Sequence, residues 1–280
     1  EALAKATLER PAEWLRVNLQ KTSAPVLAQK LGLTGASILY DRYIQVPADA
    51  KLKPLLESDS FERGEFSLQN PAAYHVVKLL DLKPGLKIWD ACAAPGGKSA
   101  PMAEMDCSLE ILASDVSESR VLKMHDLVER LGLTNVKVRC ADALGGVAGD
   151  APARGGSEQR NRASGGEASP FDRILLDVPC SNMGVIARRP ESVYRMTPES
   201  LKELAELQYR LLDSASAYLA DGGIMVYATC SPDPEETTKV VNRFLKSNPG
   251  FEKAGNPVYP SEEDPRLDGF FAQALIRKYV

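Results

Sequence analysis

Hydrophobic and polar positions follow two different periods along most of this chain. After Asn70, short apolar runs of strand length alternate with longer segments in which apolar residues recur every three or four positions. The short runs predict strands at 86–90, 109–115, 136–142, 173–177, 224–228 and 269–276. The longer segments predict helices at 71–80, 99–105, 117–131, 197–219 and 235–246. Strands that alternate with helices in this way indicate an α/β fold with a mainly parallel sheet.

The first 70 residues have a shorter and different pattern. They predict a helix at 2–9, a strand at 14–19, a second helix at 25–31 and one or two strands within 37–46. This α/β pattern is too short for half of a nucleotide-binding fold. We therefore expect two domains, a small one at 1–70 and a larger one at 71–280.

Residues 145–170 interrupt the larger domain. The segment is rich in Gly, Ala, Ser and Arg and has almost no large apolar side chains. Such a composition buries too little surface to offset the conformational entropy that ordering would cost. We predict a long flexible surface loop there. It is either a solvated insertion or, given Arg154, Arg160 and Arg162, an arm that contacts RNA.

Composition narrows the possible classes of protein. The 280 residues are 44% apolar and 26% charged, as in soluble globular proteins. No apolar run approaches the ~20 residues of a membrane helix, and the first residues lack a secretory signal, so we expect a cytoplasmic protein that binds no membrane. Two histidines and five scattered cysteines predict neither a metal site nor a disulfide framework. Cys107 and Cys140 have no special context, and we expect both to be small packed residues.

The formal net charge of −4 does not indicate nucleic-acid binding by itself. Global charge is a weak test of such binding, because local basic patches decide it.

The turn after the strand at 86–90 is rich in small residues. A turn that ends a strand and opens a helix can direct backbone N–H groups at an anion. Its end, Gly96-Gly97-Lys98-Ser99, matches the end of a phosphate-binding P-loop, but Cys92 stands where a P-loop has its first glycine. The GxGxxG fingerprint of nicotinamide-binding proteins is absent from the turn.

Four aspartates end predicted strands, namely Asp90, Asp115, Asp142 and Asp177. The carboxyl ends of parallel strands meet at one edge of a sheet, where the ligands of open α/β sheets bind. We therefore expect the four side chains to line one crevice and to favour a polar ligand such as a nucleoside. Asp115 follows Asp90 by 25 residues, about the spacing at which nucleotide-binding sheets hold a ribose diol.

Two cysteines have a setting typical of catalysis. Cys180 and Cys230 each follow a predicted strand and precede a serine, and Asp177 lies just before Cys180. A free thiol has a pKa of roughly 8.5 and acts as a nucleophile when a nearby cation lowers that pKa. The candidate cations are Lys98, Arg188 and Arg189.

Five ordered stretches carry a more specific pattern. They are residues 64–69 (GEFSLQ), 90–98 (DACAAPGGK), 177–181 (DVPCS) with 184–186 (GVI), 227–231 (YATCS) with 234–236 (PEE), and 268–271 (DGFF). Together they resemble the Sun/Fmu-type (NOL/NOP/Sun) family of RNA (cytosine-5)-methyltransferases and are similar to the bacterial 16S rRNA enzymes among them. The likeness covers residues 60–280 well and residues 1–60 loosely.

The resemblance implies a class I methyltransferase fold, Rossmann-like with a mainly parallel seven-stranded sheet, preceded by a small α/β RNA-recognition domain. It also implies S-adenosylmethionine as the methyl donor. The implied donor contacts are Cys92, Ala93, Ala94, Pro95, Gly96, Gly97 and Lys98 around the methionine part, Asp115 at the ribose, Asp142 near the adenine and Asp177 beside the methyl group. By the same likeness Cys230 is the nucleophile, Cys180 assists release of the product, and Asp177 is the acid beside the target base.

The implied reaction is methylation of carbon 5 of an unstacked cytosine in RNA, with 16S rRNA as the expected substrate and a monomer as the expected state. Val178, Asn182-Met183 and Arg188-Arg189-Pro190-Glu191 depart from the usual family residues, which leaves the choice of RNA open. The alternatives are a tRNA cytosine-5 methyltransferase, a non-catalytic ribosome-assembly factor and a P-loop ATPase.

Overall fold

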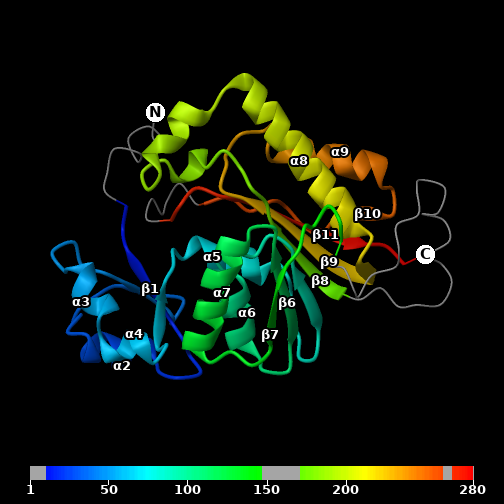
Figure 1. Ribbon diagram of the computed structural model, residues 1–280. Helices are drawn as coiled ribbons and strands as arrows, with labels where there is room; N and C mark the ends of the chain where they lie inside the picture. Colours follow the sequence, from blue (N-terminus) through cyan, green and yellow to red (C-terminus); the bar gives the residue numbers. More distant parts are fainter. Residues whose placement is uncertain (1–10, 147–170, 261–266, 280) are drawn as a thin grey trace.

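The computed structural model describes residues 11–146, 171–260 and 267–279 (Figure 1). The predicted helix at 2–9 and, apart from Gly145 and Gly146, the predicted loop at 145–170 lie outside these residues. Two sheets organise the described chain, one of seven strands and one of four. Each sheet packs against helices of its own through buried apolar side chains.

The larger sheet has the strand order β10-β11-β9-β8-β5-β6-β7. The bounds are β5 Lys87–Asp90, β6 Glu110–Asp115, β7 Val136–Cys140, β8 Phe171–Asp177, β9 Leu219–Thr229, β10 Phe251–Lys253 and β11 Phe271–Arg277. Neighbours from β9 to β7 run parallel, whereas β11 and β10 pair antiparallel at one end. The mainly parallel seven-stranded sheet that the family resemblance implies is therefore confirmed, whereas the hydrophobic pattern predicted six of its strands and missed the short β10.

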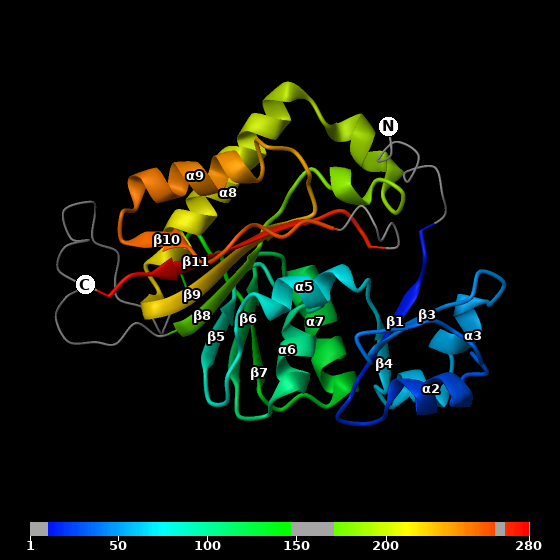
Figure 2. The same cartoon turned by 180° about the vertical axis from the view of Figure 1, so that it is seen from behind.

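Helices cover both faces of this sheet (Figures 1 and 2). Their bounds are α5 Ala72–Lys78, α6 Ser99–Met105, α7 Glu118–Leu131, α8 Pro198–Ser216 and α9 Thr238–Ser247, with short 3-10 helices η1 Met183–Val185 and η2 Pro190–Arg195. One face packs on α8 and α9, and the other packs on α5, α6 and α7. Among the described helices, none combines the length and the apolar character that crossing a bilayer requires.

Strand β8 lies inside the sheet, between β9 and β5. Its residues Ile174, Leu175 and Leu176 are all fully buried, because successive side chains point to opposite faces and helices cover both. This explains why the strand has a continuous apolar run and no alternation. The run ends at Asp177, where the chain leaves the sheet.

Two predicted helix ends are wrong. Helix α8 begins as expected, with Thr197 as N-cap and Pro198 in the first turn, but it ends at Ser216, and Leu219 already belongs to β9, paired with Phe171. Leu219 is buried in either assignment, so the apolar period could not locate the end of the helix. Helix α9 begins at Thr238 and not at 235, because turns occupy the residues between Cys230 and Thr238.

The smaller sheet is antiparallel, with the order β2-β3-β1-β4. The bounds are β1 Trp14–Val17, β2 Ile38–Leu39, β3 Tyr43–Gln45 and β4 Phe66–Leu68, with helices α2 Ala24–Lys30, α3 Leu52–Leu56 and α4 Asp59–Glu62. Its core includes Leu15, Leu27, Ile44 and Phe66. The elements after residue 46 were not predicted, because α3, α4 and β4 are too short to show a period.

Buried polar contacts join the small sheet to the large one. Arg16 of β1 forms an ion pair with Glu104 of α6, and both side chains are almost fully buried. The Gln20 Nε2 atom donates to the carbonyl oxygens of Ala103 and Glu104 at 3.3 and 3.1 Å. Gln69, just after β4, donates to the carbonyl oxygen of Gly97 in the turn before α6. The small sheet thus holds α6 at both ends.

Arg130 at the end of α7 makes a second connection. Its guanidinium donates to the carbonyl oxygens of Phe61 and Phe66 at 2.7 and 3.0 Å and lies 3.9 Å from the Phe61 ring centroid. Gly64 has a φ of +67° beside this contact, and a Cβ there would lie 2.2 Å from the Arg130 carbonyl oxygen. Only glycine permits so close an approach of the two backbones.

The Arg16–Glu104 pair predicts a large stability effect. Glu104→Ala leaves the Arg16 charge buried and unpaired, so we expect the free energy of unfolding to fall by about 3–5 kcal/mol. Urea denaturation of the purified chain measures this change. The exposed Glu110 at the start of β6 provides the control, since Glu110→Ala should change stability by about 0.5 kcal/mol or less. A loss of that small size for Glu104→Ala would contradict the prediction.

Candidate active site

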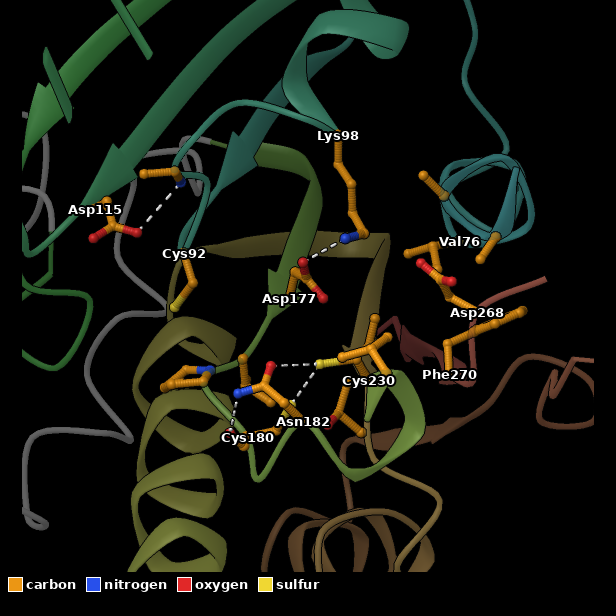
Figure 3. A pocket seen from close by; sticks show the side chains of 18 of the residues that line it. Val76, Cys92, Lys98, Asp115, Asp177, Cys180, Asn182, Cys230, Asp268 and Phe270 are labelled. Atoms are coloured by element: carbon orange, nitrogen blue, oxygen red, sulfur yellow. Dashed lines mark hydrogen bonds and ion pairs between the residues drawn. The ribbon is translucent and has the colours of Figure 1, made fainter. Parts of the chain in front are cut away.

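A cavity of about 620 Å³ opens at the carboxyl ends of the parallel strands (Figure 3). Its polar lining includes residues that end or follow β5, β6, β7, β8 and β9, namely Cys92, Asp115, Asp142, Asp177, Cys180 and Cys230. This is where ligands of open α/β sheets bind. Within the described ranges, no group of three or more His, Cys, Asp or Glu side chains is arranged to hold a metal ion.

Asp115 lies at the end of β6 with its carboxylate almost fully buried. It accepts hydrogen bonds from the backbone N–H groups of Ala94 at 3.3 Å and Ser117 at 3.0 Å, and Arg120 pairs with it at 2.9 Å. These contacts fix the carboxylate on the cavity wall. Asp142, two residues beyond β7, is exposed and also lines the cavity.

The small-residue turn after β5 serves two purposes. Cys92, Ala94 and Lys98 line the cavity, and burial raises the pKa of the Cys92 thiol. Gly96 faces away from the cavity, toward α7. Its φ is +97°, and a Cβ there would lie 3.0 Å from the Leu127 side chain, so the glycine lets α7 pack closely behind the turn.

Lys98 and Asp177 form an ion pair inside the cavity (Figure 3). Burial lowers the pKa of the Lys98 ammonium, but the charge of Asp177, its hydrogen bond and the nearby Asp90 outweigh burial and raise that pKa. The ammonium is therefore a permanent cation next to the carboxylate. The hydrogen bond with Cys180, burial and the charge of Asp177 raise the pKa of the Cys230 thiol, and Lys98, one of the three cations expected near the cysteines, acts in the opposite direction.

Arg188 does not act on the thiols as expected. Its guanidinium pairs with Asp268 at 2.9 Å and Glu13 at 3.2 Å and donates to the carbonyl oxygen of Ala12 at 2.5 Å. Asp268 in turn donates its backbone N–H to the Asn70 side-chain oxygen at 3.2 Å. Arg188 thus ties three distant segments together at the rim of the cavity.

Asp90 does not line the crevice as its strand-end position predicted. It is 0% exposed and accepts a hydrogen bond from the Ser99 hydroxyl at 2.6 Å, while its Oδ1 atom has no hydrogen-bond partner among the described residues. Burial raises the pKa of this carboxyl to about 7. The helix that follows the turn covers this strand end, which leaves three of the four aspartates in the cavity.

The expectation for Cys107 and Cys140 is also wrong, since both are exposed. Cys107 lies in the turn after α6, and Cys140 ends β7 at the edge of the sheet, where few side chains cover it. An edge position cannot be recognised from the local sequence.

Cys180 and Cys230 meet in the cavity, with their sulfurs 2.8 Å apart (Figure 3). The hydrogen bond between the thiols lowers the pKa of Cys180 and raises that of Cys230. Asn182 spans the pair, since its Oδ1 lies 3.1 Å from the Cys230 sulfur and its Nδ2 donates to the Cys180 carbonyl oxygen at 3.2 Å. Asn182 adopts a left-handed conformation with φ +60°, which asparagine tolerates better than most residues.

Three polar residues near the thiols were missed as site residues. Asn182 was noted only as a departure from the family, and Glu236 only as part of the Pro-Glu-Glu motif. Gln208 had one available signal, since it is a polar residue within the apolar stripe of α8. In the structure Gln208 and Glu236 are fully buried and hydrogen-bonded to each other at 2.9 Å.

Sequence comparisons identify relatives of this chain. The family model for 16S rRNA methyltransferase RsmB/F matches residues 77–266. Ribosomal RNA small subunit methyltransferase B of Citrobacter koseri is 35% identical over 288 residues, which cover 99% of this chain and 63% of that protein. The protein of the same name from Vibrio vulnificus is 34% identical over 262 residues, covering 85% of this chain and 57% of its own length. The chain thus spans less than two thirds of the length of these relatives.

Solved structures share the fold. The crystal structure of PH0851 superposes with a TM-score of 0.84 at 27% identity, over 99% of this chain and 62% of that chain. A methyltransferase homolog protein from Pyrococcus horikoshii has a TM-score of 0.76 at 25% identity, over 99% of this chain and 90% of its own. NSun6 from the same organism, determined with SFG, has a TM-score of 0.76 at 22% identity, over 100% of this chain and 94% of its own, a likeness of fold alone.

These comparisons confirm the class I methyltransferase fold and rule out the P-loop ATPase alternative. The chain belongs to the RsmB/F family of 16S rRNA methyltransferases.

Proposed function

We propose that this chain methylates carbon 5 of a cytosine in RNA, with S-adenosylmethionine as methyl donor and 16S rRNA as substrate. The observation that carries the proposal is the pairing of two thiols, Cys180 and Cys230, in one cavity with the Lys98–Asp177 ion pair. A P-loop or a purely structural role explains neither the paired thiols nor the cation beside them. A monomer that acts in the cytoplasm is part of the same proposal.

The cavity residues suit the methyl donor. A volume of about 620 Å³ lies within the usual range for small-molecule sites. The fixed carboxylate of Asp115 is suited to the ribose hydroxyls, Asp142 to the adenine side, and Cys92, Ala94 and Lys98 to the methionine part. When bound there, S-adenosylmethionine supplies an electrophilic methyl group.

The chain's own residues would activate the base. The Cys230 thiolate adds to carbon 6 of cytosine, and the electron pair of the carbon 5–carbon 6 double bond becomes available at carbon 5. Asp177 acts as the acid in its protonated form: it donates a proton to ring nitrogen 3 as the adduct forms and takes that proton back when the double bond re-forms, and Lys98 beside it holds its side chain in place. After carbon 5 has gained the methyl group, a base removes its proton. The double bond then re-forms and Cys230 leaves as a thiolate, a release that Cys180 assists.

The rim of the cavity carries groups suited to single-stranded RNA. Arg189 lines the cavity, and the adjoining η2 presents Tyr194, which is 91% exposed, and the exposed Arg195. An exposed aromatic ring between arginines offers a stacking surface and phosphate contacts to an unpaired strand. The small sheet remains the predicted RNA-recognition domain. A target cytosine must leave its stack to enter the cavity, and single-stranded RNA makes this least costly.

The roles of the two cysteines are tested by separate substitutions. Cys230→Ala should lower methyl transfer by on the order of 10³-fold or more, because the nucleophile is lost, and should abolish covalent trapping on RNA that contains 5-fluorocytosine. Cys180→Ala should instead accumulate a protein–RNA adduct on ordinary RNA. Denaturing gel electrophoresis of labelled RNA distinguishes these outcomes.

The exposed Cys140, outside the cavity, serves as the control, and Cys140→Ala should behave as the unsubstituted chain. If Cys230→Ala kept full activity, the assignment of the nucleophile would be wrong. Activity on a transfer RNA transcript with none on 16S rRNA would favour the tRNA alternative.

Donor binding is tested at Asp115. Asp115→Asn should weaken S-adenosylmethionine by about 10-fold to 100-fold, because a hydrogen bond to a charged group contributes about 1.5–3 kcal/mol. Isothermal calorimetry measures this affinity. Asp126→Asn, on the exposed side of α7, should leave the affinity unchanged. If the unsubstituted chain bound no S-adenosylmethionine, the non-catalytic assembly factor would be the better account.

The RNA contact is tested at Tyr194. Tyr194→Ala should raise the KM for RNA by about 5-fold or more, since stacking on one base contributes about 1–3 kcal/mol, and should leave kcat nearly unchanged. Tyr279, 83% exposed and two residues beyond the end of β11, is the matched control. Steady-state kinetics on a 16S rRNA fragment measure both values. Equal KM values for the two variants would show that Tyr194 does not contact the substrate.

A further inference from the structure

A fully buried carboxylate lies behind the two thiols. Glu236, seven residues after β9, is 0% exposed, and within the described parts of the chain no lysine or arginine forms an ion pair with it. A buried charge without a counter-ion is costly unless hydrogen bonds satisfy it. The mechanism described above does not use this residue, although it belongs to the turn that follows Cys230.

Three donors satisfy the Glu236 carboxylate. The Ser181 backbone N–H and the Gln208 Nε2 each donate to Oε1 at 2.9 Å, and the Ser181 hydroxyl donates to Oε2. Backbone N–H and carboxamide N–H groups can only donate, so Oε1 acts as an acceptor for both. The carboxylate therefore holds the residue that directly follows Cys180.

The same network reaches both sides of Cys180 and the turn after Cys230. Gln208 Nε2 also donates to the carbonyl oxygen of Pro179 at 2.9 Å, which fixes the residue before Cys180. The Ser181 and Ser231 hydroxyl oxygens lie 3.2 Å apart, and this contact links the residues that follow the two cysteines. Tyr227 of β9 donates its hydroxyl to the Glu236 carbonyl oxygen at 2.6 Å. Glu236 thus connects β8, β9 and α8 directly behind the sulfurs.

The charges around the two thiols are not symmetric. The contact between the sulfurs could favour either thiolate, depending on which thiol donates. The surrounding charges differ, since Glu236 opposes a negative charge on Cys180, whereas at Cys230 the opposing charge of Asp177 outweighs the favourable charge of Lys98. The charge of Glu236 therefore favours the protonated form of Cys180.

We infer that Glu236 is a positioning residue, which fixes Cys180 against Cys230 through Ser181 and Gln208 and whose charge opposes a negative charge on Cys180. The inference rests on the proposed function, because it assigns the support behind the two thiols of that mechanism. Glu236 touches neither sulfur, so it acts through the backbone of residues 179–181 and through its charge.

Glu236→Gln tests the charge with almost no change in shape. Turnover on RNA should fall by about 10-fold to 100-fold, as the loss of a partner that orients a reacting group commonly causes, and the protein–RNA adduct should accumulate as it does in Cys180→Ala. Alkylation of Cys180 by iodoacetamide, mapped by peptide mass spectrometry across pH 6–9, should become faster by about 3-fold or more at neutral pH, because the opposing charge is gone.

Glu235→Gln is the matched control. Glu235 is the neighbouring acid of the same motif, but it is exposed and pairs only with Lys239 among the described residues. It should retain the turnover and the alkylation profile of the unsubstituted chain. If Glu236→Gln behaved in the same way as this control, the inference would be overturned.

Ser181→Ala covers the case in which Glu236→Gln does not fold. It removes one donor to the carboxylate and leaves the charge and the backbone donor in place, so it should accumulate the adduct to a smaller extent. Product release at the unsubstituted rate would contradict the inference. The alkylation assay needs neither RNA nor S-adenosylmethionine, so it reports on Glu236 even if the proposed substrate is wrong. The proposed methylation itself is tested separately by Cys230→Ala.

Discussion

The parallel pairing of β8 and β9 is the constraint on which the site depends. Asp177 lies opposite Ala228 in this register, so the segments that leave the two strands start side by side. That places Cys180 and Cys230 in contact although 50 positions separate them. Both strands are buried on both faces, so a slip of one residue would turn every side chain toward the wrong helix layer. The apolar core that fixes this register therefore also fixes the distance between the thiols.

The polar groups on the two sides of the thiols differ in their charge. On the cavity side, Lys98 pairs with Asp177 and supplies a cation next to Cys230. On the buried side, Glu236 is held by three neutral donors and supplies a negative charge near Cys180. A low-dielectric interior strengthens both effects. The two thiols therefore have different surroundings, with the charge of Glu236 acting on Cys180 and the Lys98–Asp177 pair beside Cys230.

The small sheet is connected through buried polar contacts to the cavity wall that carries Cys92 and Lys98. Arg16 pairs with Glu104 at the end of α6, and Gln69 bonds the turn from which α6 begins. Because α6 follows directly on the turn that carries Cys92 and Lys98, any shift of the small sheet would move the cavity wall. This connection depends on ion pairing and hydrogen bonds more than on apolar packing, which makes it specific in geometry.

For the larger sheet, the sequence by itself determined the order of the longer strands and helices, the parallel pairing and most of the residues that line its carboxyl edge, because apolar periods and strand-end residues are local features. It correctly brought Asp115, Asp142, Asp177, Cys180 and Cys230 to one cavity. Only the tertiary structure decided which strand-end acid is covered, namely Asp90, which lies under Ser99 and α6. It also decided which cation lies near the thiols, namely Lys98. Burial by a distant element and contacts across 28 or more positions, such as Gln208 with Glu236, leave no local trace in a sequence. For this reason only the folded structure shows that Glu236 and Gln208 support the segment that carries Cys180.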